Sequence, residues 1–225
     1  GSMRYLADGE EQFSPDEPVT NLCWHDALVW CNALSELTGR RCAYYLDEDL
    51  TEPYRKAVTF RMDMFDKPGY PILTPPLREA IGRGGGMPRE PDTNFGRLIY
   101  LDPQADGFRL PYVQEFDRLC SAARLRRRST LEGQALAAEG VPARTRAVDA
   151  GWPDEHGLHE LNGNVLEWAW SPLDSYLGVM GKYRLNGYGC FSMTAEQVRA
   201  AAKPYEDAVY NARPYFGFRV VRRAE

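Results

Sequence analysis

Cysteines and histidines are the residues of this chain whose types could carry metal or nucleophilic chemistry. Thiolates bind soft metal ions and act as nucleophiles, and neutral imidazoles bind zinc. No two cysteines form a C-x-x-C pair, and no set of cysteines and histidines has zinc spacing. We therefore expect most of the thiols to be buried and reduced, acting as small apolar side chains. The five cysteines and three histidines are Cys23, Cys31, Cys42, Cys120, Cys190, His25, His156 and His159.

His156 and His159 are separated by the i, i+3 spacing that brings two side chains onto one face of a helix. Gly157 lies between them, and the surrounding residues are typical of a loop, which argues against a helix. Ordinary polar turn residues are the favoured interpretation, and a metal site on these histidines is the alternative.

The composition favours one soluble domain. The chain has 225 residues, of which 44% are hydrophobic, so it can bury one sizeable core without disulfides or metals. The net charge is -5 and the basic residues are mostly dispersed, which argues against nucleic acid as a partner. The basic run from Arg124 to Arg128 is interpreted as the solvated end of a helix. No apolar run reaches membrane-spanning length, so we expect no membrane partner and a cytoplasmic location, unless a leader has been removed.

Periodicity and turn signals predict the elements that must position these residues. Apolar spacings of three and four predict helices from Trp24 to Leu37 and from Tyr112 to Ala123. Between Lys67 and Pro103 the chain is rich in glycine and proline, which predicts a long surface excursion. The C-terminal third combines aromatic residues with short strand-like runs, so the whole predicts an α+β fold. The face of the first helix expected to pack inward carries Ala27, Trp30, Cys31, Leu34 and Leu37.

Three segments and a closing motif follow one another in a characteristic order. They are Pro18 to Ser35, with Trp24, Asp26, Cys31 and Asn32; Gly107 to Pro111, with Glu115; Gly157 to Trp168; and Gly217-Phe218-Arg219. In this order they resemble the formylglycine-generating enzyme and sulfatase-modifying family. The resemblance implies a C-type lectin fold over residues 18–225, with two helices packed on a twisted antiparallel sheet. Residues 1–17 would be a tag remnant and an N-terminal arm.

These landmarks are interpreted mainly as structural. Arg109 is expected to anchor a buried carboxylate, and Glu115 to cap the helix that it begins. The sequence from Asn162 to Asn164 is typical of a tight turn that tolerates positive φ.

The resemblance implies that family members which oxidise a substrate cysteine are copper-dependent. Their copper ligands would be two cysteines, five residues apart, near the C-terminal end. The matching stretch here ends at Cys190, and the position five residues further on is Ala195. A single thiolate cannot supply the two-coordinate site of monovalent copper. We therefore expect no copper, no catalytic residue and no oxidase chemistry of the family's kind.

The resemblance also implies a structural calcium ion in the loop before the last tryptophan of the third segment. Carried over to this chain, the ligands would be Glu160, the carbonyls of Gly163 and Val165, and Glu167. All are hard oxygen donors, which suit calcium. The alternative is that Glu160 and Glu167 face solvent or pair with arginines.

The same scaffold is used by variable proteins of diversity-generating retroelements, which display changeable residues near a C-terminal G-F-R ending. The corresponding window here is rich in residue types that dominate adaptable recognition surfaces, although core aromatics are the alternative interpretation. A capped helix from Thr194 to Lys203 is predicted within it. The residues expected to bind the ligand are Tyr188, Cys190, Phe191, Ser192, Tyr205, Asp207, Tyr210, Asn211 and Tyr215, with Phe216 beside them.

The resemblance thus predicts a non-catalytic domain that binds a protein or a small-molecule ligand, with no oligomeric state predicted. One alternative is a metal-dependent oxidoreductase with a non-standard site, which would need Cys190 and a histidine or a second subunit. Another is an accessory module of a larger system, with the 67–103 excursion as its partner surface.

Overall fold

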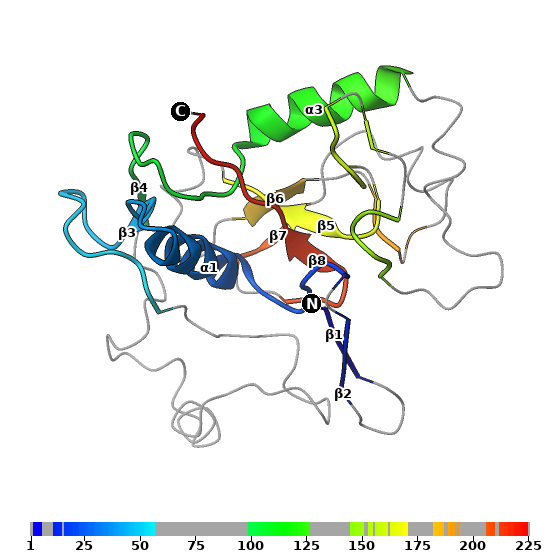
Figure 1. Cartoon of the computed structure of the whole chain (residues 1–225), viewed down its shortest axis with the longest axis horizontal. Helices are drawn as coiled ribbons and strands as arrows, with labels where there is room; N and C mark the ends of the chain where they lie inside the picture. Colours follow the sequence, from blue (N-terminus) through cyan, green and yellow to red (C-terminus); the bar gives the residue numbers. More distant parts are fainter. Residues whose placement is uncertain are drawn as a thin grey trace.

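Two helices and three small sheets make up the described part of the chain (Figure 1). The structure is a computed structural model and describes residues 2–5, 11–14, 16–56, 99–126, 145–150, 153–154, 156–161, 163–170, 182–186, 189–191, 193, 206–209 and 212–224. The elements in chain order are β1 (Ser2–Tyr5), β2 (Glu11–Ser14), α1 (Trp24–Leu37), β3 (Tyr44–Tyr45), β4 (Tyr100–Leu101), α3 (Val113–Arg126), β5 (Leu166–Trp168), β6 (Lys182–Asn186), β7 (Glu206–Ala208) and β8 (Phe216–Phe218).

The largest sheet has four strands in the order β7-β6-β5-β8. It lies at the centre of Figure 1, with α3 above it and α1 to its lower left. β6 pairs antiparallel with both β5 and β7, whereas β5 and β8 run parallel. The predicted α+β class is confirmed, but the parallel pair departs from the antiparallel sheet that we expected. β8 joins the edge opposite to its predecessor β7, so no tight hairpin fixes its direction.

The first helix begins and ends where the sequence predicts, from Trp24 to Leu37. At its start the Asp26 carboxylate accepts a hydrogen bond of 2.8 Å from the backbone N–H of Cys23. This places a negative charge in the first turn, where the helix dipole favours it. At its end Gly39 adopts a φ of 68°, the left-handed conformation that terminates helices.

The inward face of α1 differs from the predicted one. Ala27 and Cys31 are buried, as expected, but Trp30 and Leu37 are 46% and 84% exposed. The buried face instead includes Leu28 and two polar residues, Asn32 and Ser35. The polarity of those two residues misled the prediction, since both are buried to bond the backbone of other segments.

Asn32 is fully buried and uses its whole hydrogen-bonding capacity on backbone groups. Its Oδ1 accepts from the N–H groups of Ala43 at 3.0 Å and Tyr44 at 3.1 Å. Its Nδ2 donates to the carbonyls of Tyr44 at 2.8 Å and Tyr54 at 3.0 Å. One amide therefore fixes two segments of the 43–54 stretch against α1.

The Gly107–Pro111 segment is joined to the same assembly. The backbone N–H of Phe108 donates to the Ser35 hydroxyl, and that of Leu110 donates to the Tyr44 hydroxyl, each at 2.8 Å. A Cβ at Gly107 would lie 2.1 Å from the Arg41 carbonyl oxygen, so this close approach requires glycine.

Arg109 and Glu115 organise the start of α3. Arg109 anchors a carboxylate and Glu115 caps the helix, as the sequence predicts, but the Glu115 side chain is 44% exposed and so is not the buried carboxylate that we expected. The guanidinium of Arg109 donates two hydrogen bonds of 2.8 Å to the Glu115 carboxylate. Glu115 also accepts from the backbone N–H of Tyr112 at 2.8 Å, which caps the helix entry. The hydrogen bonds from Arg109 lower the pKa of Glu115.

Three tryptophans occupy the space between α1 and the central sheet. Trp24 stacks on Trp170 with ring centroids 5.4 Å apart, and Trp168 meets Phe216 edge to face at 5.2 Å. The indole N–H groups of Trp24 and Trp168 donate to the carbonyls of Ala169 and Leu22. The rings of Trp24 and Trp168 are therefore buried with their polar atoms satisfied.

The end of the predicted 67–103 excursion and the end of the N-terminal arm both contact the packed domain. Ile99 is buried, and β4 pairs with β3, so the 67–103 excursion returns to the core before Pro103. The backbone N–H of Val148 donates to the carbonyl of Asp16 at 2.7 Å, which docks the end of the N-terminal arm. Residues 57–98 lie outside the described residues.

In the described part of the chain, no helix combines the length and apolar character needed to cross a membrane.

Asn32→Ala should lower the free energy of unfolding by at least about 3 kcal/mol, because the N–H groups of Ala43 and Tyr44 and the carbonyl of Tyr54 lose their Asn32 partner at roughly 1–3 kcal/mol each. The Tyr44 carbonyl keeps the hydrogen bond of 2.9 Å that it accepts from Tyr54. Urea denaturation measures the loss. The control is Gln104→Ala, since the Gln104 amide makes an exposed hydrogen bond of 3.0 Å to Arg223. A loss of similar size in the two variants would contradict the role given to Asn32.

Candidate functional site

The three histidines do not form a metal site in the described part of the chain. His25 is buried on α1, where its Nδ1 lies 3.0 Å from the Tyr54 hydroxyl. His156 is exposed in a turn in which Gly157 has a φ of 77°, so this segment is a turn and not a helix, as the sequence indicates. Among the described residues no group of three or more histidine, cysteine or acidic side chains is placed to hold an ion.

The described cysteines are buried and form no disulfides with one another. Cys23, Cys31, Cys42 and Cys190 all lie inside the fold. Burial raises the pKa of Cys23 and Cys31 well above the usual range, and that of Cys42 to about 11. This confirms the expectation for these four residues, while the side chain of Cys120 lies outside the described residues.

The predicted oxidase position is occupied by a core residue. Cys190 is 4% exposed and belongs to the cluster of buried apolar side chains around Trp168 and Phe216. Its carbonyl accepts from the backbone N–H of Met193 at 3.0 Å, which fixes the turn that follows. Ala195 lies outside the described residues.

The structure describes four of the nine residues expected to bind a ligand. Phe191, Asp207 and Tyr215 are half-buried, and the rings of Phe191 and Tyr215 meet edge to face at 6.5 Å. Cys190 is buried and so contributes no exposed surface, and the adjacent Phe216 is fully buried. Outside the described residues lie Tyr188, Ser192, Tyr205, Tyr210 and Asn211, together with the whole of the predicted helix from Thr194 to Lys203.

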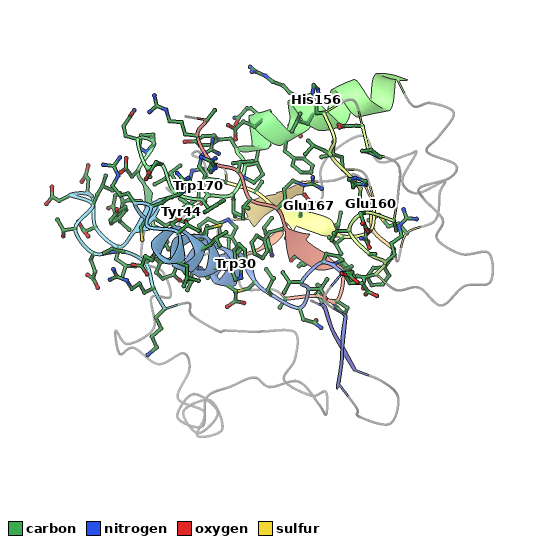
Figure 2. The ribbon with its side chains drawn as sticks, in the orientation of Figure 1. Trp30, Tyr44, His156, Glu160, Glu167 and Trp170 are labelled. Carbon is green, nitrogen blue, oxygen red and sulfur yellow. The ribbon has the colours of Figure 1, made fainter. Side chains whose placement is uncertain are left out.

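The loop before β5 contains the residues for which calcium was expected. The N–H of Gly163 donates to the Glu160 carbonyl at 3.3 Å, and that of Val165 donates to the Gly163 carbonyl at 2.7 Å. Glu160 and Asn164 adopt positive φ values of 54° and 64°, which produces the tight turn that the sequence predicts. Figure 2 shows Glu160 and Glu167 beneath α3, with Tyr44 and Trp170 nearer to α1.

Both carboxylates of this loop are engaged by arginines. The Nη2 of Arg146 donates to Glu160 Oε2 at 2.8 Å. Arg219 holds Glu167 with two hydrogen bonds, a 2.6 Å bond from Nη2 to Oε1 and a short bond from Nε to Oε2. The other oxygen of Glu160, Oε1, is buried without a hydrogen-bond partner. The calcium site stays a prediction, but its two carboxylates carry partners that the resemblance does not supply.

Arg146 and Arg219 are the residues that sequence reasoning missed. Arg219 belongs to the closing motif, but nothing in its neighbourhood indicates which carboxylate it meets 52 residues away. Arg146 belongs to none of the motifs. The signal that the sequence offers is the pair of acidic residues, Glu160 and Glu167, in the third motif segment, since a carboxylate that becomes buried requires a partner.

Comparison with known proteins identifies the family and the fold. A sequence model of the sulfatase-modifying factor enzyme 1-like domain matches residues 3–224. Among solved structures, Treponema denticola variable protein 1 superposes with a TM-score of 0.62 at 20% identity, covering 95% of this chain and 73% of that chain. The crystal structure of CarF gives a TM-score of 0.57 at 22% identity, covering 93% and 69%. The chain therefore has the C-type lectin-like fold expected of the family.

A sequence relative is named chaperone protein LppX, from Paenibacillus barcinonensis. It is 21% identical over 192 residues, which are 75% of this chain and 57% of that protein. The chain thus spans little more than half the length of this relative.

His25 predicts how the stability of the domain depends on pH. Burial lowers the pKa of His25 from 6.5 to about 4, so between these values the unfolded chain binds a proton that the folded chain rejects. The free energy of unfolding should therefore fall as the pH falls from about 6.5 to about 4, by up to roughly 3 kcal/mol from this group.

Urea denaturation across this pH range measures the effect. His25→Gln should flatten this part of the pH dependence, whereas His156→Gln, which changes an exposed turn residue, should leave it as it is. An unchanged slope in the His25 variant would show that another group is responsible.

Proposed function

We propose that this chain, which belongs to the sulfatase-modifying factor enzyme 1-like domain family, is a non-catalytic domain that binds a protein or a small-molecule ligand. The proposal rests on Ala195, five residues after Cys190. The resemblance implies that the oxidases of this family have a second cysteine at that position. With one thiolate the linear site for monovalent copper is incomplete.

The surroundings of Cys190 support this proposal. Its 4% exposure leaves the thiol little access to a peptide substrate, and its neighbours are apolar core residues. Reactive cysteines are usually partly exposed, whereas Cys190 is buried in the apolar cluster. A role for Cys190 in packing accounts for these features.

The recognition surface that we propose lies between Tyr183 and Phe216. In its described part, Phe191 and Tyr215 expose part of their rings and contact one another, and Phe216 packs beneath Tyr215 with centroids 5.1 Å apart. Aromatic rings supported by a rigid core provide contact area at little cost in conformational entropy. Asp207 on β7 is also half-buried and adds a carboxylate to the proposed surface.

The names of two relatives are compatible with a binding role. One solved structure is named a variable protein and one sequence relative is named a chaperone protein. Neither name is that of an oxidase, and both proteins share with this chain at least a distant similarity of fold or sequence.

The proposed surface requires that several of Tyr188, Phe191, Tyr205, Tyr210 and Tyr215 are accessible to solvent. Hydroxyl-radical footprinting with mass spectrometry measures this, because exposed rings are oxidised faster than buried rings of the same type. We expect at least three of the five to react faster than the fully buried Tyr44, Tyr54 and Phe116, which serve as internal references. Protection of all five to the level of these references would refute the surface.

A further inference from the structure

The loop from His159 to Glu167 brings two carboxylates into the interior of the domain. The side chains of Glu160 and Glu167 are only 5% and 7% exposed. Burying a carboxylate is costly unless opposite charge and hydrogen bonds compensate it. The stability of this loop therefore depends on where its positive charge comes from.

One positive charge is Arg219, whose position is fixed by the central sheet. In the parallel pair of β5 and β8, Glu167 lies opposite Gly217, and Arg219 directly follows β8. Its guanidinium holds both oxygens of Glu167 and also donates to the His159 carbonyl at 3.1 Å. It therefore connects the beginning of the loop to the strand at its end.

The other positive charge is Arg146, which is held to the loop through its own backbone. Its N–H donates to Asn164 Oδ1 at 3.0 Å, and its carbonyl accepts from Asn164 Nδ2 at 3.0 Å. With the main chain fixed in this way, the side chain reaches Glu160 Oε2 at 2.8 Å. Asn164 has a φ of 64°, so the turn and the arginine contact are parts of one arrangement.

We propose that Arg146 and Arg219 together take the place of a divalent cation, so that the 159–167 loop holds its conformation without metal. Two carboxylates and two guanidinium groups leave no net charge, and a calcium ion would add two positive charges to the cluster. Calcium would also need six to eight oxygen ligands. Most of the expected ligand atoms already have partners: both oxygens of Glu167 bond to Arg219, Glu160 Oε2 bonds to Arg146, and the Gly163 carbonyl accepts from the N–H of Val165.

This proposal does not depend on the proposed function. A loop stabilised by guanidinium groups keeps its shape whatever the concentration of divalent cations, whether or not the domain binds a ligand. It also predicts which residues exclude the ion, and this makes the proposal testable by substitution.

The test compares the melting temperature of the purified protein in about 5 mM calcium chloride with that in excess EGTA. This calcium concentration exceeds the dissociation constants of even weak protein calcium sites. The wild-type Tm should differ by less than about 1 °C between the two conditions, whereas an ion bound at about 100 times its dissociation constant would raise it by roughly 5–10 °C. A calcium-dependent rise in the wild type would overturn the proposal.

Arg219→Gln and Arg146→Gln complete the test. Each should lower the Tm in EGTA, and calcium should restore part of the loss, because a carboxylate freed of its arginine becomes available to the ion. The control is Arg55→Gln, which breaks an ion pair between the exposed side chains of Arg55 (61%) and Glu36 (40%). This variant should lower the Tm by no more than about 2 °C and should not create a calcium response.

The two variants cover different risks. Arg146 is the more exposed arginine, so its variant should fold even if the Arg219 variant does not. If neither variant gains a response to calcium, the arginines are not what excludes the ion, and the proposal is wrong.

Discussion

A single buried amide determines how the first half of the domain is assembled. Asn32 is the shared partner of backbone groups from Ala43, Tyr44 and Tyr54, which belong to a stretch with little regular structure. Buried backbone groups that a strand or helix does not pair need other partners, and a buried side chain can supply them. The Tyr44 hydroxyl in turn accepts from the N–H of Leu110, next to the Arg109–Glu115 pair that starts α3. Asn32 thus links α1 to the segment that leads into α3.

The second half uses the same physical solution with charged groups. The strands are only two to five residues long, so backbone ladders satisfy a small part of the buried polar groups. Arg146 and Arg219 take over this role in the loop before β5, where they meet Glu160 and Glu167. A scaffold held by such specific side-chain contacts can carry long irregular segments between its fixed points, and recognition surfaces are often built on segments of this kind.

The parts that could be predicted from the sequence are those governed by local signals. Periodicity located α1, and motif residues located the anchor Arg109, the cap Glu115 and the turn that ends at Asn164. The inward face of α1 was misjudged because Asn32 is polar, yet its burial depends on backbone groups that become its partners only in the folded chain. The parallel pairing of β8, the return of Ile99 to the core and the partners of both arginines are likewise long-range consequences of the fold.

The central claim is that this member of the family binds without oxidising. The most direct measurement incubates the purified protein with copper, oxygen and a cysteine-containing peptide, and quantifies aldehyde in the peptide by mass spectrometry. Cys190→Ser is the matched variant, since it removes the one thiol at the oxidase position. The account predicts that wild type and variant yield the same background. Aldehyde formed by the wild type above the level of Cys190→Ser would contradict it.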